Sequence, residues 1–196
     1  MARQKTAPVS VKDRILAVAT RLFRFQGYSE TGINQIIEEA GAARASLYLH
    51  YPTKEVLGRA YLKSYGETQF ELLAHLMKRY PDPAKFITAW ARILKREARD
   101  VGLNGCAIAN LRSQTPADHG DLLHDIRATA TRTVDVLQKY LEECRKDGRL
   151  SNRHNAKLTA RRLFAAYEGV MQTWQLTGDL EVVDDFAGIG QALLRD

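Results

Sequence analysis

Cysteine and long apolar segments are scarce in this chain of 196 residues. Its two cysteines, Cys106 and Cys144, are too few for a disulfide scaffold or a cysteine-rich zinc site, so reduced thiols are expected. No segment approaches the roughly 20 apolar residues that a membrane-spanning helix needs. The polar start of the chain lacks the apolar core of a secretory signal. We therefore expect a cytoplasmic protein that does not enter a membrane.

Sequence signatures of catalysis are also missing. The pair Gly188 and Gly190 is too short and wrongly placed for a phosphate-binding loop, and no Gly-x-Ser-x-Gly elbow occurs. Four histidines show neither the four-residue spacing nor the carboxylate framework of a metal site: His75, His119, His124 and His154. We expect no catalytic residues, no cofactor and no metal.

Positive charge is concentrated near the start of the chain. The net charge is +6, and the first 60 residues carry nine lysines or arginines against five acids. A basic N-terminal region suits an approach to nucleic-acid phosphates, although solvated surface charge would also explain it. The length suffices for one sizeable helical core or two small domains.

Two short helices joined by a tight turn are predicted between Thr31 and Pro52. The apolar residues of the first helix have helical spacing: Ile33, Ile36, Ile37 and Ala40. Thr31 is expected to cap its N-terminus, and Gly41 permits a sharp turn at its end. The second helix has about two turns, because proline lacks the amide that would continue it. Ala43, at its start, offers no side-chain acceptor for a cap.

The segment 31–57, TGINQIIEEAGAARASLYLHYPTKEVL, resembles without a gap the DNA-binding signature of the TetR family of transcriptional regulators. The matching residues are Thr31, Ile36, Ala40, Gly41, Arg44, Leu47, Tyr48, His50, Tyr51, Thr53, Lys54 and Glu55. The similarity extends back to Val11. It implies an all-α fold of about nine helices. Residues 1–57 would form an N-terminal arm and a three-helix helix-turn-helix domain, and 58–196 a larger helical ligand-binding and dimerisation domain.

The rest of the sequence also has helical patterning. Proline, glycine and capping residues divide it into six further helices: 53–81, 83–102, 104–113, 117 or 120 to 147, 155–177 and 180–195. No alternation typical of a β-strand has a useful length.

The second short helix of a helix-turn-helix enters the DNA major groove. By the resemblance, Arg44 is expected to bind guanine, Ala45 to contact a thymine methyl group, and Ser46 to bond a base or a phosphate. Four further residues match phosphate-binding positions: Thr31, Tyr48, His50 and Lys54. Arg3 and Lys5 are candidates for the minor groove. Core packing is the alternative for Tyr48, and a solvated surface is the alternative for Arg44.

The resemblance implies a homodimer bound to a palindromic operator, because one short helix contacts few base pairs. The expected dimer surface is the last two helices, about 155–195. Their apolar residues have helical spacing: Leu163, Ala166, Tyr167, Val170, Met171, Trp174, Phe186, Ile189, Leu193 and Leu194. The alternative is that these residues form only the chain's own core.

The family senses small molecules in a cavity among its middle helices. Candidate lining residues are Phe86, Trp90, Phe164 and Tyr167, although aromatic residues at this spacing also occur in simple cores. Gly105-Cys106, followed four residues later by Asn110, resembles a subset in which a cysteine senses electrophiles or oxidants. A helix N-terminus favours the thiolate. The alternative for Cys106 is a small buried hydrophobe.

The resemblance therefore implies a ligand-responsive regulator, by family norm a repressor, released from DNA by a small-molecule or electrophile effector. A ligand-independent architectural DNA-binding protein is the main alternative, because it would share the DNA-binding motif. An enzyme is the weakest alternative.

Overall fold

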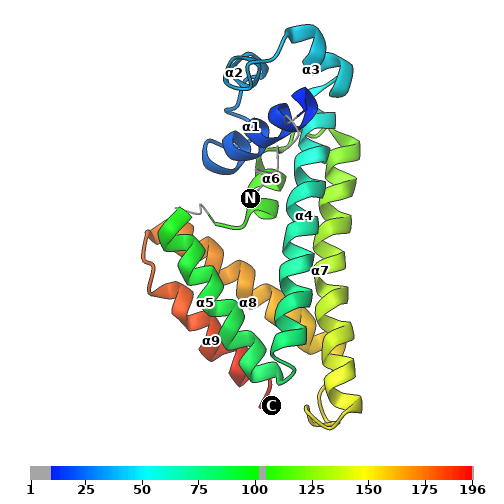
Figure 1. Cartoon of the computed structure of the whole chain (residues 1–196). Helices are drawn as coiled ribbons and strands as arrows, with labels where there is room; N and C mark the ends of the chain where they lie inside the picture. The colour runs from blue at the N-terminus through cyan, green and yellow to red at the C-terminus, as the bar shows by residue number, and fades with distance from the viewer. Residues whose placement is uncertain (1–9, 102–104, 196) are drawn as a thin grey trace, which may run out of the picture.

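The computed structural model describes residues 10–101 and 105–195, and these form nine α-helices and no strand (Figure 1). The helices are α1 Val11–Phe25, α2 Ile33–Glu39, α3 Arg44–His50, α4 Lys54–Arg79, α5 Pro83–Val101, α6 Ala107–Gln114, α7 Gly120–Lys146, α8 Ala156–Thr177 and α9 Val182–Ala192. The expected all-α fold is confirmed. Arg3 and Lys5 lie outside the described residues.

The helices are arranged around two long ones that lie side by side (Figure 1). α4 and α7 run along the length of the molecule, and α1, α2 and α3 gather at one end of them. We call this end the head. At the other end, α5, α8 and α9 pack together and against the long pair. α6 lies between the two groups.

Local capping signals explain several helix ends. Pro83 is the first residue of α5, and the Asp82 carboxylate accepts a hydrogen bond from the Lys85 amide at 2.8 Å. Asn155 caps α8 in the same way. Gly178 ends α8 with φ of +70°, a conformation that an L side chain rarely adopts.

The first apolar core belongs to the head but is not built from the head alone. It contains buried residues of α1, α2 and α3, together with Leu111 of α6 and Leu122 and Ile126 of α7. The expected domain boundary at residue 57 falls inside α4, which runs without interruption from Lys54 to Arg79. The two parts of the chain therefore share packing on both sides of that boundary.

The second core occupies the opposite end and uses much of the apolar pattern of α8 and α9. Four residues expected at a dimer surface are buried inside the chain, each with at most 5 % of its surface exposed: Leu163, Val170, Met171 and Phe186. The expectation that these four residues face a partner is wrong, because they pack in the chain's own second core together with residues of α4, α5 and α7. Exposed apolar residues remain on these helices: Leu158, Leu176 and Ile189.

Gly58 marks the closest approach between α4, the head and α7. A Cβ atom at this position would lie 2.8 Å from Cε2 of Tyr28 and 3.0 Å from Cδ2 of Leu122. Both neighbours are fully or almost fully buried, so neither can move aside cheaply. The absence of a side chain at Gly58 allows the three segments to meet.

Gly58→Ala should therefore lower the free energy of unfolding. Overpacking costs about 1–3 kcal/mol, which exceeds the gain of about 1 kcal/mol from replacing glycine by alanine inside a helix. Gly66→Ala is the matched control in the same helix, because its Cβ would lie 3.4 Å from the nearest atom. Urea denaturation should show a loss for Gly58→Ala and no loss for Gly66→Ala. Equal stability of the two variants would contradict this account.

Candidate nucleic-acid interface and internal cavity

The α2–α3 unit is held from beneath by buried side chains. Gly41 has φ of +56° and turns the chain between the two helices, as expected. Leu47 of α3 is fully buried, and Tyr51, just after the helix, is 3 % exposed. Ala43 caps α3 without a side-chain hydrogen bond, as expected from its lack of an acceptor. Packing rather than capping therefore fixes this seven-residue helix.

The opposite face of α3 is open to solvent. Arg44, Ala45, Tyr48 and His50 are exposed, and Ser46 is half-buried. Tyr48 is 42 % exposed, so its side chain does not belong to the core of the chain. This face of α3 therefore presents a guanidinium, a hydroxyl, a phenol and an imidazole together on one short helix.

A contact with α2 holds the Arg44 side chain. Its Nη2 donates a hydrogen bond to Oδ1 of Asn34 at 2.6 Å, and both residues are exposed. Asn34 was not expected at the site, because the helical pattern marks it only as a solvated position. The contact orients the guanidinium beside the open face of α3.

Leu49 is a second residue that the sequence analysis missed. It is 79 % exposed, in the last turn of α3. The signal available in the sequence was an apolar residue outside the buried stripe that Leu47 and Tyr51 define. Its exposure extends the open face of α3 with an apolar contact surface.

Thr31 departs from its expected role. The residue is fully buried, and its hydroxyl donates a hydrogen bond to the Gly27 carbonyl at 2.6 Å. The cap of α2 is Gly32 instead, with no side-chain hydrogen bond. The expected contact of the Thr31 hydroxyl with phosphate is therefore not available in this structure, because that group closes the turn after α1.

Lys54 is also engaged within the chain. Its Nζ donates a hydrogen bond to the Ser29 carbonyl at 3.2 Å and lies 4.8 Å from the centre of the Tyr28 ring. Partial burial lowers the pKa of Lys54. The ammonium thus stabilises the loop between α1 and α2, and in this structure it does not point freely outward as a phosphate contact would.

A small cavity lies among the helices below the head. It has a volume of about 30 Å³ and is lined by residues of α4, α5, α6, α7 and α8. Four of the six expected ligand residues line it: Trp90, Cys106, Phe164 and Tyr167. Trp90 and Tyr167 stack with ring centres 5.3 Å apart. A space of this size holds about one water molecule, so side chains fill most of the region between these helices.

Phe86 and Asn110 do not line the cavity. Phe86 is 1 % exposed and packs between Trp90 and Tyr140, with ring centres 5.8 and 5.0 Å away. It is a core residue, which is the alternative that the aromatic spacing left open. Asn110 lies one turn into α6, half-buried and away from the lining.

The cavity contains polar groups that the sequence analysis missed. Tyr65 and Gln69 reach it from α4, and Glu168 reaches it from α8. Burial raises the pKa of the Glu168 carboxyl group. These residues lie on faces of α4 and α8 that look amphipathic in sequence, so only their tertiary placement reveals them.

Cys106 does not have the activated thiol that a helix N-terminus suggested. Burial and the nearby Glu168 carboxylate raise the pKa of Cys106 to about 12. The amides of Ala109 and Ile108 at the start of α6 act in the opposite direction, but their effect is smaller. The prediction of a stabilised thiolate is wrong for this structure, because desolvation outweighs the helix terminus.

Several polar contacts join the head to the start of α7. The Glu55 carboxylate accepts a hydrogen bond from the Leu122 amide at 3.0 Å and thus caps α7. Arg59 forms ion pairs with Asp121 and Asp125, with N–O distances of 2.8 and 2.7 Å. We call these five residues the α4–α7 clamp. Arg59 is 39 % exposed, so each ion pair contributes at most about 1 kcal/mol.

The loop after α1 is fastened to α6 and α7 as well. The Gln114 side-chain oxygen accepts a hydrogen bond from the Ser29 amide at 3.1 Å. The Tyr28 hydroxyl lies 3.1 Å from Nδ1 of His119, just before α7. The head is therefore connected to the helices that surround the cavity through both α4 and this loop.

Comparison with known proteins decides the family. The model described as "Bacterial regulatory proteins, tetR family" matches residues 15–61. The model described as "Tetracyclin repressor-like, C-terminal domain" matches residues 84–188, which is more than half of the chain. The chain belongs to the TetR family. Its relatives are transcriptional regulators, so the enzyme alternative is discarded.

Among curated relatives, the HTH-type transcriptional regulator LmrA of Bacillus subtilis is 43 % identical over 84 residues, covering 42 % of this chain and 45 % of that protein. The negative transcriptional regulator IcaR of the biofilm operon icaADBC, from Staphylococcus epidermidis, is 29 % identical over 133 residues, covering 67 % and 70 %. The chain spans about half the length of the first curated relatives it matches.

Solved structures of TetR-family regulators have the same fold. SCO4454 of Streptomyces coelicolor is 26 % identical, with a TM-score of 0.82 and 95 % of each chain covered. The reduced form of Escherichia coli NemR also has a TM-score of 0.82, at 18 % identity and with 94 % and 97 % covered, and supports the fold alone. Within the described residues, no helix is long and apolar enough to cross a membrane.

A raised thiol pKa predicts slow chemistry at Cys106. With a pKa of about 12, only about one thiol in a hundred thousand is ionised at pH 7, and the thiolate is the reactive form. In a Cys144→Ser variant, dithionitrobenzoate should label the native protein far more slowly than the protein unfolded in guanidinium. Rapid labelling of the native variant would show that Cys106 is activated after all.

Proposed function

We propose that this TetR-family protein is a homodimeric repressor that binds a palindromic operator and is released by a small molecule. The open face of α3 carries this proposal, because a rod supported from beneath by Leu47 and Tyr51 presents hydrogen-bonding side chains to solvent. The concentration of positive charge in the first 60 residues favours the same end of the molecule for phosphates. The protein would act in the cytoplasm, where operators are found.

Within this proposal, Arg44 contacts a base and Tyr48 and His50 contact phosphates, while Ala45 and Ser46 complete the contact face. Arg44 exchanges its hydrogen bond with Asn34 for acceptors of guanine, or keeps it and is oriented by it. Thr31 and Lys54 contribute to DNA binding only indirectly, because their side chains fix the loop that precedes α2.

The proposed dimer surface is the outer face of α8 and α9. Its exposed apolar residues are Leu158, Leu176 and Ile189. Leu176 is 78 % exposed, which is costly in water for a leucine unless another surface covers it. A second copy of the chain, related by two-fold symmetry, would cover the exposed apolar residues of both subunits at once.

The proposed effector site is the internal cavity. A cavity of about 30 Å³ is far below the roughly 300 Å³ or more of typical ligand pockets, so an effector must enlarge it. Tyr65 and Gln69 of α4 form part of the wall, and Glu55 and Arg59 near the start of the same helix belong to the α4–α7 clamp. Enlargement would therefore displace α4 and, through it, the head. Trp90, Cys106, Phe164 and Tyr167 would contact the effector.

Selection of bound DNA from a random pool tests the proposal directly. It should yield a two-fold symmetric site, and an unselective pool at moderate salt would contradict operator binding. An architectural DNA-binding protein would differ from the proposed repressor in one respect. No compound that enlarges the internal cavity would release it from DNA.

Substitutions in α3 should separate base contacts from phosphate contacts. Arg44→Ala should relax preference at one base pair by about 1–3 kcal/mol, whereas Tyr48→Ala should weaken binding to all operator variants alike. Lys139→Ala, an exposed cation of α7, is the charge-matched control and should leave binding unchanged. Equal loss for Arg44→Ala across every operator variant in a binding titration would refute its role in base recognition.

Charge placed on the outer face of α8 and α9 should separate the subunits. Leu176→Glu combined with Ile189→Glu should raise the dimer dissociation constant by about a hundredfold or more, because two apolar side chains lose their burial. Phe25→Glu, at an exposed apolar site on α1, is the control. Sedimentation equilibrium should detect monomers for the double variant, whereas the native protein and Phe25→Glu should remain dimers. An unchanged dimer would place the interface elsewhere.

A further inference from the structure

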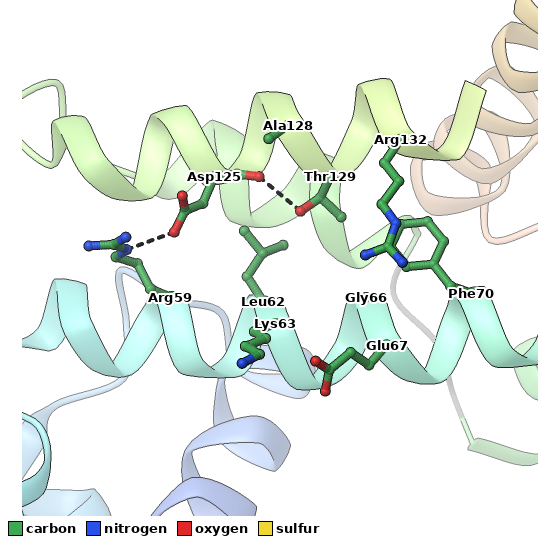
Figure 2. A pocket seen from close by; sticks show the side chains of 10 residues that line it. All are labelled: Arg59, Leu62, Lys63, Gly66, Glu67, Phe70, Asp125, Ala128, Thr129 and Arg132. Atoms are coloured by element: carbon green, nitrogen blue, oxygen red, sulfur yellow. Dashed lines mark hydrogen bonds and ion pairs between the residues drawn. The ribbon is translucent and has the colours of Figure 1, made fainter. Parts of the chain in front are cut away.

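A second hollow lies outside the effector cavity, on the surface between α4 and α7 (Figure 2). It has a volume of about 300 Å³, ten times that of the internal cavity. We call it the α4–α7 groove; its lining includes Leu62, Gly66, Phe70, Asp125, Ala128 and Arg132. None of its lining residues lines the internal cavity. The two hollows are therefore separate sites.

Small residues leave the middle of the groove open. Gly66 of α4 has no side chain there, and a Cβ at that position would lie 3.4 Å from the methyl carbon of Thr129. Ala128 supplies only a methyl group from the α7 side. Phe70 adds apolar surface from α4, whereas Leu62 is 2 % exposed and forms only a small part of the lining. The floor can therefore accept the flat or extended body of an organic molecule.

Lys63 and Glu67 of α4 add one charge of each sign to the lining (Figure 2), and the two ends of the groove differ in charge. At one end, Arg59 is neutralised by its ion pairs with Asp121 and Asp125. At the other end, the Arg132 guanidinium lies over the Phe70 ring, with its carbon 4.1 Å from the ring centre (Figure 2). Among the described residues, no carboxylate forms an ion pair with Arg132. Its planar donors are thus held in place while their hydrogen-bonding capacity remains free.

We propose that the α4–α7 groove binds a small amphipathic organic anion. The carboxylate or sulfonate of the ligand pairs with the guanidinium of Arg132, which suits bidentate recognition of such groups. The apolar body lies on the floor formed at Gly66, Ala128 and Leu62. Because α4 supplies one wall and α7 the other, a bound ligand stabilises the present arrangement of the two helices. It therefore opposes the movement that the internal effector requires.

The test uses the full-length protein and anilinonaphthalene sulfonate, an aromatic anion whose fluorescence rises in apolar sites. Arg132→Gln should weaken its binding about tenfold, because the charge-assisted hydrogen bonds are lost. Ala128→Phe should abolish binding, because a ring at this exposed position fills the groove. Phenylnaphthylamine, which lacks the anionic group, should bind more weakly to the native protein and should not respond to Arg132→Gln.

Neighbouring substitutions provide the controls. Arg127→Gln removes an exposed cation of α7, and Thr131→Phe adds a ring at an exposed position, but neither residue lines the groove. Both should bind the probe as the native protein does. If Arg132→Gln and Ala128→Phe also leave binding unchanged, the probe lies elsewhere, for example in the internal cavity, and the proposal is overturned. DNA binding is measured separately, so this result would leave the proposed repressor function intact.

Discussion

Packing of α7 into the head is the constraint on which the remaining structure depends. Leu122 and Ile126 are buried in the same core as α1, α2 and α3, and Gly58 lets α4 approach them closely. The neighbouring ion pairs of Arg59 are partly exposed and weak, so apolar contact, not charge, holds the head in place. The hydrogen bond from the Leu122 amide to the Glu55 carboxylate also fixes the position of the start of α7 relative to α4. A displacement of either long helix must therefore reach the head.

The internal cavity and the α4–α7 groove lie beside the same helix, α4, so ligands bound in them would have opposite effects on its position. The internal cavity is small and must grow to accept a ligand, while the α4–α7 groove already has room for one. Tyr65 and Gln69 face the first hollow, and Leu62 and Gly66 face the second, so a single helix carries both walls. The proposed effector would favour displacement of α4, and the proposed ligand of the groove would favour its present position. The two ligands would thus oppose each other without meeting.

Local signals in the sequence were sufficient for the ends of several helices, whereas the expected fold came from the family resemblance. Asp82, Pro83 and Gly178 mark helix ends through backbone chemistry that acts over a few residues, and each marks one in the structure. The environments of individual side chains were not predictable in this way. The resemblance placed Thr31 at a phosphate contact, and for Cys106 the sequence left both a thiolate at a helix start and a small buried hydrophobe open, yet both residues are buried in the structure. Likewise, the periodicity of α8 could not tell a residue buried in the core, such as Leu163, from one left exposed, such as Leu176.

The small volume of the internal cavity also has a consequence for effector sensitivity. The stacked rings of Trp90 and Tyr167 line a space that holds about one water molecule, so the proposed effector would occupy only those protein molecules in which the cavity has transiently enlarged. The apparent dissociation constant then exceeds the intrinsic one by the reciprocal of the open fraction, about a hundredfold if one molecule in a hundred is open. Substitutions of neighbouring residues that loosen this aromatic stack would change the effector concentration needed for release from DNA, although the substituted residues contact neither the effector nor the DNA.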